Sequence, residues 1–257
     1  MCHLNSNKIQ QGFSQSAGQY DLFSSLHRGI ADKLASRIIT EPEPATLLDV
    51  GCGTGYLTGT LKEHWPKCKV VGLDFAQGML EAARLKHEDI IWILADGHNL
   101  PFLDGRFDIV TSNLAYQWAE DLSHTFFEAR RVLRPNGTLA CTLFGYHTCH
   151  ELFQSLDEAR GEAFQFVRLP GQLKVREALI SSGFEKPIVD GQQIKMGFKD
   201  MYALTAWFKT IGAPHLPREG YLGREVLSRA ALIYREKFSY LQGIGATFEV
   251  ISVYAKK

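Results

Sequence analysis

The sequence lacks the features of a membrane protein, a secreted protein and a zinc protein. No uninterrupted apolar run in its 257 residues approaches the roughly 20 that are needed to span a bilayer. The first ten residues, MCHLNSNKIQ, contain no apolar stretch of the kind that secretory signals carry. The five cysteines form no CxxC pair and no metal-like spacing with histidine. We therefore expect a cytoplasmic protein with reduced thiols, no bound metal and no membrane association.

The chain also lacks an excess of charge of either sign. Lys plus Arg and Asp plus Glu each number 28, so the formal net charge is zero. Proteins that bind nucleic acid usually carry a basic surface, because the phosphate backbone must be neutralised. The balance argues against nucleic acid as a partner, and it still permits a local basic patch that docks an acidic protein.

The composition, 45% hydrophobic and 22% charged, is that of one globular domain with ample core. Residues 13–40 predict a helical N-terminal segment, because apolar residues recur every four positions from Leu26 to Ile38. The prolines of EPEP, residues 41–44, then end the helical pattern.

Strands and helices alternate through residues 45–145. We predict strands at TLLDVG, KVVGLD, IIWILAD, FDIVTSN and TLACTLFG, helices at 54–64, 76–86 and 123–133, and a turn at RPNG. This alternation is typical of an α/β fold whose mostly parallel, doubly wound sheet has helices on both faces. Later helical patterns at 150–182, 199–211 and 221–240 accompany two strands, at 186–198 and 247–257. About 50 residues separate these strands, too many for a plain loop, so residues 199–242 are interpreted as a helical cap insertion.

The stretch LLDVGCGTGYLTGTL, residues 47–61, places three glycines at alternate positions after the first strand. It fits a tight turn without a ligand, a dinucleotide-binding loop, or a loop that binds S-adenosylmethionine (SAM). The dinucleotide fingerprint is GxGxxG, and the spacing Gly51-x-Gly53-x-Gly55 differs from it by one residue. Asp49 would also repel a pyrophosphate, at a cost on the order of several kcal/mol. SAM has no phosphate, and its cationic aminoacyl end suits a nearby carboxylate.

Acids end the next two strands as well. Asp74 follows VVGL and can accept hydrogen bonds from both ribose hydroxyls, while Phe75 and Met79 can enclose the adenine. Asp96 follows the third strand and can accept the adenine amine. Because the carboxyl ends of parallel strands meet at one edge of the sheet, these residues should share one site.

Four motifs in this order resemble those of the class I SAM-dependent methyltransferases. They are LLDVGCGTGYLT, VVGLDFAQGML, ADGHNLPFLDGRFDIVTSN and EARRVLRPNGTL, and they cover residues 47–145. The resemblance implies a Rossmann-like sheet of seven strands, the last antiparallel. It also implies a set of SAM-binding residues: Arg28, Asp49, Gly51, Cys52, Gly53, Gly55, Asp74, Phe75, Met79, Ala95, Asp96, Gly97, Asn113 and Ala115.

A narrower resemblance covers nearly the whole chain. The segments FSQSAGQYDLFSSLHRGIADKL, SNLAYQWAEDL, LFGYHTCHELFQSL, WFKTIGA and FEVISVYAKK are similar to the malonyl-acyl carrier protein O-methyltransferases of biotin synthesis. One departure is Tyr116, where a leucine is expected in NLALQW. The resemblance implies methylation of the free carboxylate of malonyl-acyl carrier protein, or of malonyl-CoA.

Methyl transfer to a carboxylate needs alignment and exclusion of water rather than a general base, because a carboxyl group with a pKa of about 4 is already ionised. The resemblance implies that the helical segment 13–40 folds over the SAM site as a lid. Tyr20 lies in this lid, and Tyr116, Gln117 and Trp118 follow the fourth strand. We predict that these four residues form the catalytic wall, where an aromatic face favours the sulfonium. His147 and His150 follow the fifth strand and are further candidates for contact with the acceptor.

An acyl carrier protein is acidic, so docking it would require a basic rim. The arginines that cluster in sequence are Arg130, Arg131 and Arg134, and, in the cap, Arg218 and Arg224. The fourth strand ends in TSNLAY and lacks the Asn-Pro-Pro-Tyr turn of nucleobase methyltransferases. Three other functions stay open: methylation of another small carboxylate or metabolite, SAM binding without catalysis, and NAD-dependent reduction.

Overall fold

The computed structural model describes residues 6–161, 169–213 and 222–257. Its strands are β1 Thr46–Val50, β2 Lys69–Asp74, β3 Ile91–Leu94, β4 Phe107–Asn113, β5 Leu133–Phe144, β6 Glu185–Phe198, β7 Ser239–Tyr240 and β8 Gly243–Lys256. Its helices are α1 Ser6–Phe23, α2 Ser25–Ile38, α3 Tyr56–His64, α4 Gln77–Arg84, the 3-10 turn η1 Tyr116–Trp118, α5 Leu122–Val132, α6 His150–Arg160, α7 Gln172–Ser181, α8 Met201–Thr210 and α9 Arg224–Lys237.

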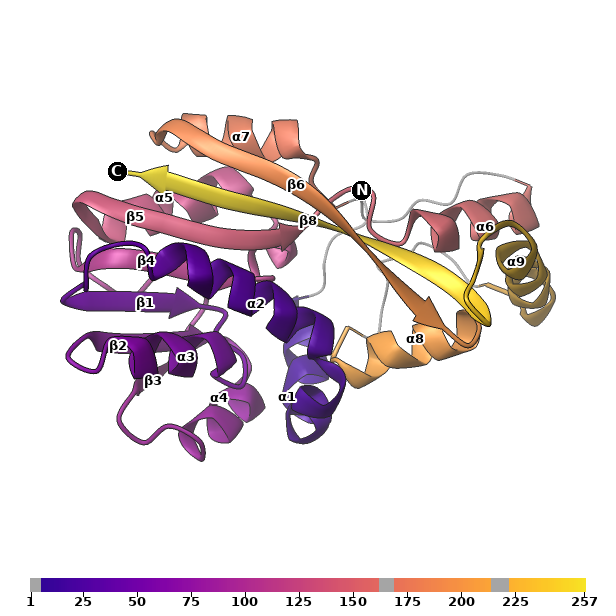
Figure 1. The fold of residues 1–257 in the computed structure, drawn as a ribbon, viewed down its shortest axis with the longest axis horizontal. Helices are drawn as coiled ribbons and strands as arrows, with labels where there is room; N and C mark the ends of the chain where they lie inside the picture. Colours follow the sequence, from indigo (N-terminus) through magenta and orange to yellow (C-terminus); the bar gives the residue numbers. More distant parts are fainter. Residues whose placement is uncertain (1–5, 162–168, 214–221) are drawn as a thin grey trace.

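The strands form one sheet in the order β3-β2-β1-β4-β5-β8-β6, and the short β7 pairs with β8 (Figure 1). The first five strands run parallel, while β8 is antiparallel to both β5 and β6. This confirms the α/β class and the antiparallel last strand expected from the sequence. The order reverses between β1 and β4, which is where open α/β sheets bind ligands.

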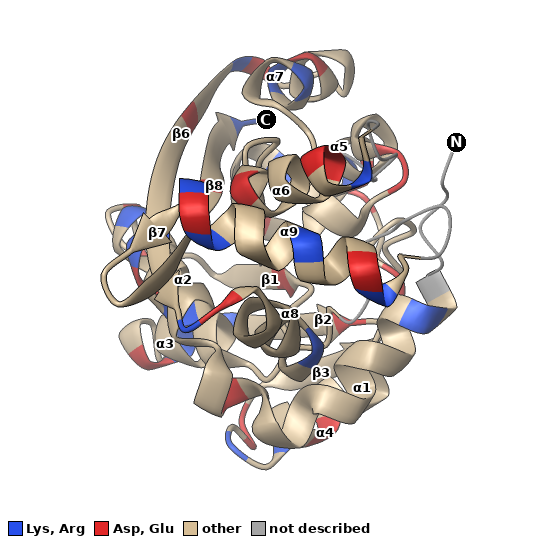
Figure 2. Ribbon diagram, turned by 90° about the vertical axis from the view of Figure 1, so that its right-hand side faces the viewer, with Lys and Arg blue, Asp and Glu red and all other residues tan. Residues whose placement is uncertain are grey.

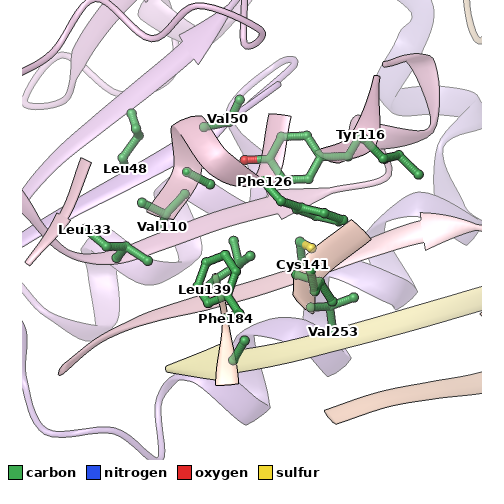
Figure 3. Packing of buried hydrophobic residues seen from close by; sticks show 14 of the residues in the cluster. Leu48, Val50, Val110, Tyr116, Phe126, Leu133, Leu139, Cys141, Phe184 and Val253 are labelled. Atoms are coloured by element: carbon green, nitrogen blue, oxygen red, sulfur yellow. The ribbon is translucent and has the colours of Figure 1, made fainter. Parts of the chain in front are cut away.

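Two apolar layers cover the two faces of the sheet. On one face, α5 and α7 pack through Phe126, Ala129 and Leu179 onto the core seen in Figure 3. On the other face, α2 and α3 pack through residues that include Leu34 and Leu61. The apolar stripe predicted for the N-terminal segment is confirmed, since Leu26, Ile30, Leu34 and Ile38 are all buried.

A third core lies beyond the end of β5. Strands β6 and β8 continue past Phe144, which pairs with Val250, and this extension runs to the right in Figure 1. Helices α6, α8 and α9 pack on it around buried residues such as Phe248 and Tyr234. The described residues of the predicted cap therefore form a helical layer attached to the last strand, whereas residues 214–221, with Arg218, lie outside the described ranges.

The N-terminal segment is helical and consists of two helices, since the chain breaks at Ser24 between α1 and α2. One local prediction was wrong in detail. The RPNG segment is not a free turn but an irregularity within β5: Leu133 pairs with Phe107, and the next pair joins Thr138 to Ile109. Asn136 has a φ of 65°, in the left-handed region that asparagine tolerates, so the extra residues bulge without ending the strand.

Helix α1 lies against α4 at Gly78. A Cβ added to Gly78 would stand 2.4 Å from the carbonyl oxygen of Ser14 in α1. Gly212, after α8, is equally close, since its Cβ would stand 2.6 Å from Ser16 Oγ and 2.8 Å from Phe13 Cδ1. Glycine is required at both positions for α1 to pack this closely against α4 and the end of α8.

Replacing Gly78 with alanine is expected to destabilise the protein by about 1–3 kcal/mol, because a methyl group would meet backbone that can move only with the whole of α1. Urea unfolding measures the change. The matched control is Gly18→Ala within α1, where nothing lies within 4 Å of the new Cβ. Alanine at this exposed helical position should raise the free energy of unfolding by roughly 0.5–1 kcal/mol. Equal stability of the two variants would contradict the close packing of α1 on α4.

Candidate active site

A cavity opens at the carboxyl ends of β1, β2 and β4, beneath α1. It encloses about 910 Å³ including its mouth, within the range of small-molecule sites. A smaller cavity of about 430 Å³ adjoins it. The two have Tyr20, Gly51, Gly53 and Asn113 in common, so together they form one continuous site.

The glycine loop forms the floor between the two cavities. The amides of Gly51 and Cys52 donate to the Leu73 carbonyl at 2.7 and 3.0 Å, which ties the loop to β2. Gly51 has a φ of 70°, and a Cβ there would stand 2.3 Å from the Ala115 Cβ. Only glycine fits this crossing between the loop and the segment after β4. Gly55, by contrast, packs against Trp92 and lines neither cavity.

Asp74 is the carboxylate at the end of β2. It is buried, and its two oxygens accept the amides of Gly53 and Ala76, each at 2.8 Å. Burial raises the pKa of Asp74 to about 6, although these backbone donors oppose the shift. Each carboxylate oxygen accepts more than one hydrogen bond, so Asp74 keeps acceptor capacity toward the larger cavity that it lines.

Asp49 is the more deeply buried acid, with 1% of its surface exposed. Its Oδ2 accepts from Thr58 Oγ1 at 2.5 Å, while Oδ1 has no hydrogen-bond partner among the described residues. Burial raises the pKa of Asp49 to about 7, with a smaller contribution from the charge of Asp74. Asp49 lines the smaller cavity together with Arg28, so an acid and a base face the same space.

Aromatic side chains enclose the larger cavity. Phe13 of α1 packs edge-on to Phe75 and Trp118, with ring centroids 6.4 and 5.9 Å apart, and Met79 also lines the space. Phe13 was missed in the sequence because it lies about 60 residues before Phe75 along the chain and α1 carries no motif.

The segment after β4 carries three predicted catalytic residues. Tyr116 and Trp118 line the larger cavity. Tyr116 is buried edge-on to Phe126, with its hydroxyl directed toward Val50 (Figure 3) and without a partner among the described residues. Gln117 does not line either cavity, because its Nε2 donates to the Leu114 carbonyl at 2.7 Å and turns the side chain inward.

Asp96 and Gly97 follow β3 and line the larger cavity, whereas Ala95 does not. Asp96 Oδ1 accepts the amide of His98 at 2.9 Å and lies 2.8 Å from His98 Nδ1. Partial burial opposes the shift, but the bonds from His98 hold the pKa of Asp96 below its usual value. The carboxylate is therefore ionised at the rim of the cavity.

Polar contacts hold α1 over the site. Gln10 Nε2 donates to the Phe75 carbonyl at 2.6 Å, and Thr54 Oγ1 donates to Asp21 Oδ1 at 2.7 Å. Lys86 forms an ion pair with the other oxygen of Asp21. Gln10, Asp21, Thr54 and Lys86 were also missed in the sequence, because each pair spans more than 30 residues.

The predicted residues thus divide into two groups. Those that line one or both cavities are Tyr20, Arg28, Asp49, Gly51, Cys52, Gly53, Asp74, Phe75, Met79, Asp96, Gly97, Asn113, Ala115, Tyr116 and Trp118. His27, to which the sequence assigns no role, also lines the smaller cavity. Those that line neither are Gly55, Ala95 and Gln117, together with His147 and His150.

Two of the arginines proposed for carrier docking are engaged within the protein. Arg131 pairs with Glu128 and Asp104, and Arg134 pairs with Asp108. Helix α9 begins at Arg224, but basic and acidic residues alternate along it (Figure 2), so the described residues of α9 form no rim of a single charge. Over the described ranges no group of three or more His, Cys, Asp or Glu could hold a metal ion, and no helix is long and apolar enough to cross a membrane.

Comparison with known proteins gives a consistent family. A family model described as a methyltransferase domain matches residues 48–141. Similar relatives are the malonyl-[acyl-carrier protein] O-methyltransferases of Halorhodospira halophila, Hahella chejuensis and Geobacter sulfurreducens. They are 34%, 32% and 32% identical over 95%, 98% and 96% of this chain, and over 85%, 91% and 97% of their own length.

Solved structures agree at the level of the fold. A protein from Bacillus halodurans with a methyltransferase designation has a TM-score of 0.64 at 20% identity, covering 88% of this chain and 98% of its own. A phosphoethanolamine N-methyltransferase from Haemonchus contortus, solved with S-adenosylhomocysteine, has a TM-score of 0.56 at 18% identity, covering 88% of this chain and 52% of its own. At these identities the likeness shows the fold alone.

Asp49→Asn is expected to stabilise the unliganded protein near pH 8 and to change its stability little near pH 4. The raised pKa of Asp49, about 7 against an ordinary 3.8, means that the folded state favours the protonated carboxyl. This contribution is fully present below about pH 4 and is lost as the pH rises through about 7. Urea unfolding between these limits should show a difference on the order of 2–4 kcal/mol at the upper end.

The matched control is Asp89→Asn, whose side chain is 66% exposed. Its effect on the free energy of unfolding should be small across the range. If the free energies of unfolding of the wild type and Asp49→Asn differed by a constant amount from about pH 4 to about pH 8, ionisation of Asp49 would not destabilise the folded state.

Proposed function

The chain belongs to the malonyl-[acyl-carrier protein] O-methyltransferase family, and on that premise we propose that it transfers a methyl group from SAM to the free carboxylate of malonyl-acyl carrier protein. The product is the malonyl methyl ester, an intermediate on the route to the pimeloyl precursor of biotin. Malonyl-CoA is the alternative acceptor, because it presents the same acyl group on a phosphopantetheine thioester.

The observation that best supports SAM is the unpaired Asp49 Oδ1 at the smaller cavity, which Arg28 also lines. A buried carboxylate oxygen without a donor is costly, and the ammonium of an amino acid end would relieve that cost. Arg28 would hold the carboxylate of the same end. A phosphate-bearing nucleotide fits less well, since Asp49 and Asp74 would both repel it.

The remaining contacts follow from the cavity lining. Asp74 would accept the ribose hydroxyls, Phe75 and Met79 would enclose the adenine, and Asp96 would accept its amine. The glycine loop, with Cys52, Asn113 and Ala115, would support the ligand through its backbone. Gly55 would act by shaping the turn, and Ala95 by its amide, which donates to the Asp74 carbonyl at 3.1 Å.

The protein's part in the reaction is to align and to exclude water. When bound, SAM supplies an electrophilic methyl group on a sulfonium, so the protein needs no base for an ionised acceptor. Tyr20 lies where the two cavities join, and burial raises the pKa of its hydroxyl far above the usual value, so it stays a neutral donor. Tyr20 and Trp118 are proposed to form the aromatic wall, with Tyr116 beneath it and Gln117 bracing the turn.

Purified protein supplied with methyl-labelled SAM and malonyl-acyl carrier protein is expected to form a labelled methyl ester that releases methanol in base. Malonyl-CoA should react more slowly, because it lacks the carrier's surface, and free malonate and other diacids should react least. Mass spectrometry of the carrier locates the added methyl group. Acetyl-carrier protein is the control, since it has no free carboxylate and should gain nothing.

A faster reaction with a free diacid than with any malonyl thioester would replace the proposed acceptor by a small metabolite. Binding of SAM without turnover of any acceptor would identify a SAM-binding protein that is not an enzyme. Binding of NAD in place of SAM would refute the assignment of SAM as the co-substrate.

Asp74→Ala is expected to weaken binding of S-adenosylhomocysteine about 100-fold or more. The variant removes two potential charge-assisted bonds to the ribose and also releases the amides of Gly53 and Ala76. Calorimetric titration measures the affinity, and circular dichroism checks that the fold is kept. Asp89→Ala, at the exposed end of the α4–β3 connection, should bind like the wild type. Unchanged affinity in Asp74→Ala would refute the ribose assignment.

A further inference from the structure

The roles proposed above assign no function to the polar side chain of His27. His27, in the first turn of α2, lines the smaller cavity with Asp49 and Arg28. Its Nδ1 is buried and has no hydrogen-bond partner among the described residues. A buried ring nitrogen without a partner is costly to maintain, so its presence in the wall of a ligand cavity calls for a ligand.

Rings from three other elements, two of them more than 100 residues away along the chain, surround the imidazole. Its centroid lies 5.8 Å from that of Tyr20 in α1, 5.8 Å from Phe144 at the end of β5 and 6.0 Å from Trp207 in α8. The His27 carbonyl accepts Asn113 Nδ2 at 3.1 Å, which holds the start of α2 against the β4 segment. The ring therefore stands where the lid, the sheet and the C-terminal helical layer meet.

The charges around His27 already match the amino acid end of SAM. Asp49 is available to the ammonium and Arg28 to the carboxylate. Among the residues that line the two cavities, no further lysine or arginine remains for the carboxylate of the methyl acceptor. Burial lowers the pKa of His27 to about 4, so the imidazole is neutral at physiological pH. A neutral N–H can orient a carboxylate without cancelling the charge that makes its oxygen nucleophilic.

We propose that His27 is an acceptor-binding residue that donates a hydrogen bond from its ring to the free carboxylate of the methyl acceptor. This inference rests on the proposed function. One carboxylate oxygen takes the bond from His27, and the other forms the new O–C bond while the S–C bond breaks and its electron pair stays on sulfur. No proton is transferred, so His27 acts by orientation alone.

The test compares His27→Phe with His27→Gln. Phenylalanine keeps a ring among Tyr20, Phe144 and Trp207 but removes both nitrogens, whereas glutamine restores a neutral N–H donor. His27→Phe is expected to lower kcat/KM for malonyl-carrier protein about 10- to 100-fold, as for a lost bond to a charged group, and His27→Gln should recover much of it. The affinity for S-adenosylhomocysteine should stay within about threefold of wild type in both, and unfolding midpoints should be similar.

A second measurement isolates the carboxylate. Wild-type protein loaded with S-adenosylhomocysteine should bind malonyl-carrier protein more tightly than acetyl-carrier protein, and His27→Phe should lose about the same factor from this preference as from kcat/KM. A purely structural role would weaken both carriers alike and would overturn the proposal. So would a matching loss of S-adenosylhomocysteine affinity, which would place His27 on the cofactor. If wild-type protein methylates no malonyl thioester, the proposed function fails instead, whatever the variants do.

Discussion

Two carboxylates buried at one edge of a parallel sheet constrain the rest of the site. Asp49 and Asp74 lie at the carboxyl ends of the neighbouring strands β1 and β2. Asp49 pairs with Gly72, so Asp74 lies two residues further along β2. Burial raises the pKa of both, so the unliganded fold bears an electrostatic cost. Thr58 and the amides of Gly53 and Ala76 offset part of it. What remains is a cavity complementary to a ligand with a cationic end and hydroxyl donors, which describes SAM better than a phosphate-bearing nucleotide.

The lid is a consequence of that constraint. Electrostatic contacts gain strength when water is excluded, and α1 provides the cover. That helix is not held by its own sequence, since its apolar periodicity is weak; it is held by the close approaches at Gly78 and Gly212 and by the pairing of Asp21. Because Gly212 follows α8, the cofactor cavity depends on the C-terminal layer, and the extension of β6 and β8 that supports this layer serves the active site.

The sequence predicts what short-range chemistry determines. Gly51, Asp49 and Asp74 could be assigned because a strand, a turn and a helix within 30 residues create the loop and its acids. Phe13 and Trp207 could not, because their places depend on packing between elements up to 200 residues apart. The RPNG bulge was read as a turn since the same residues suit both, and only pairing with β4 decides between them. Gln117 has the right position in the chain, but a local bond to Leu114 turns it away from the cavity.

The two halves of the site therefore differ in how they are encoded. Loops from consecutive βα units build the half of the site around the glycine loop, so this half can be recognised from one sequence motif. The half around His27 is assembled from α1, α2, β5 and α8, and its contacts to Phe144 and Trp207 join residues more than 100 positions apart in sequence. A substitution there can change the acceptor without disturbing the glycine loop. This is why the methyltransferase class follows from residues 47–145, whereas the acceptor is indicated only by similarity along nearly the whole chain.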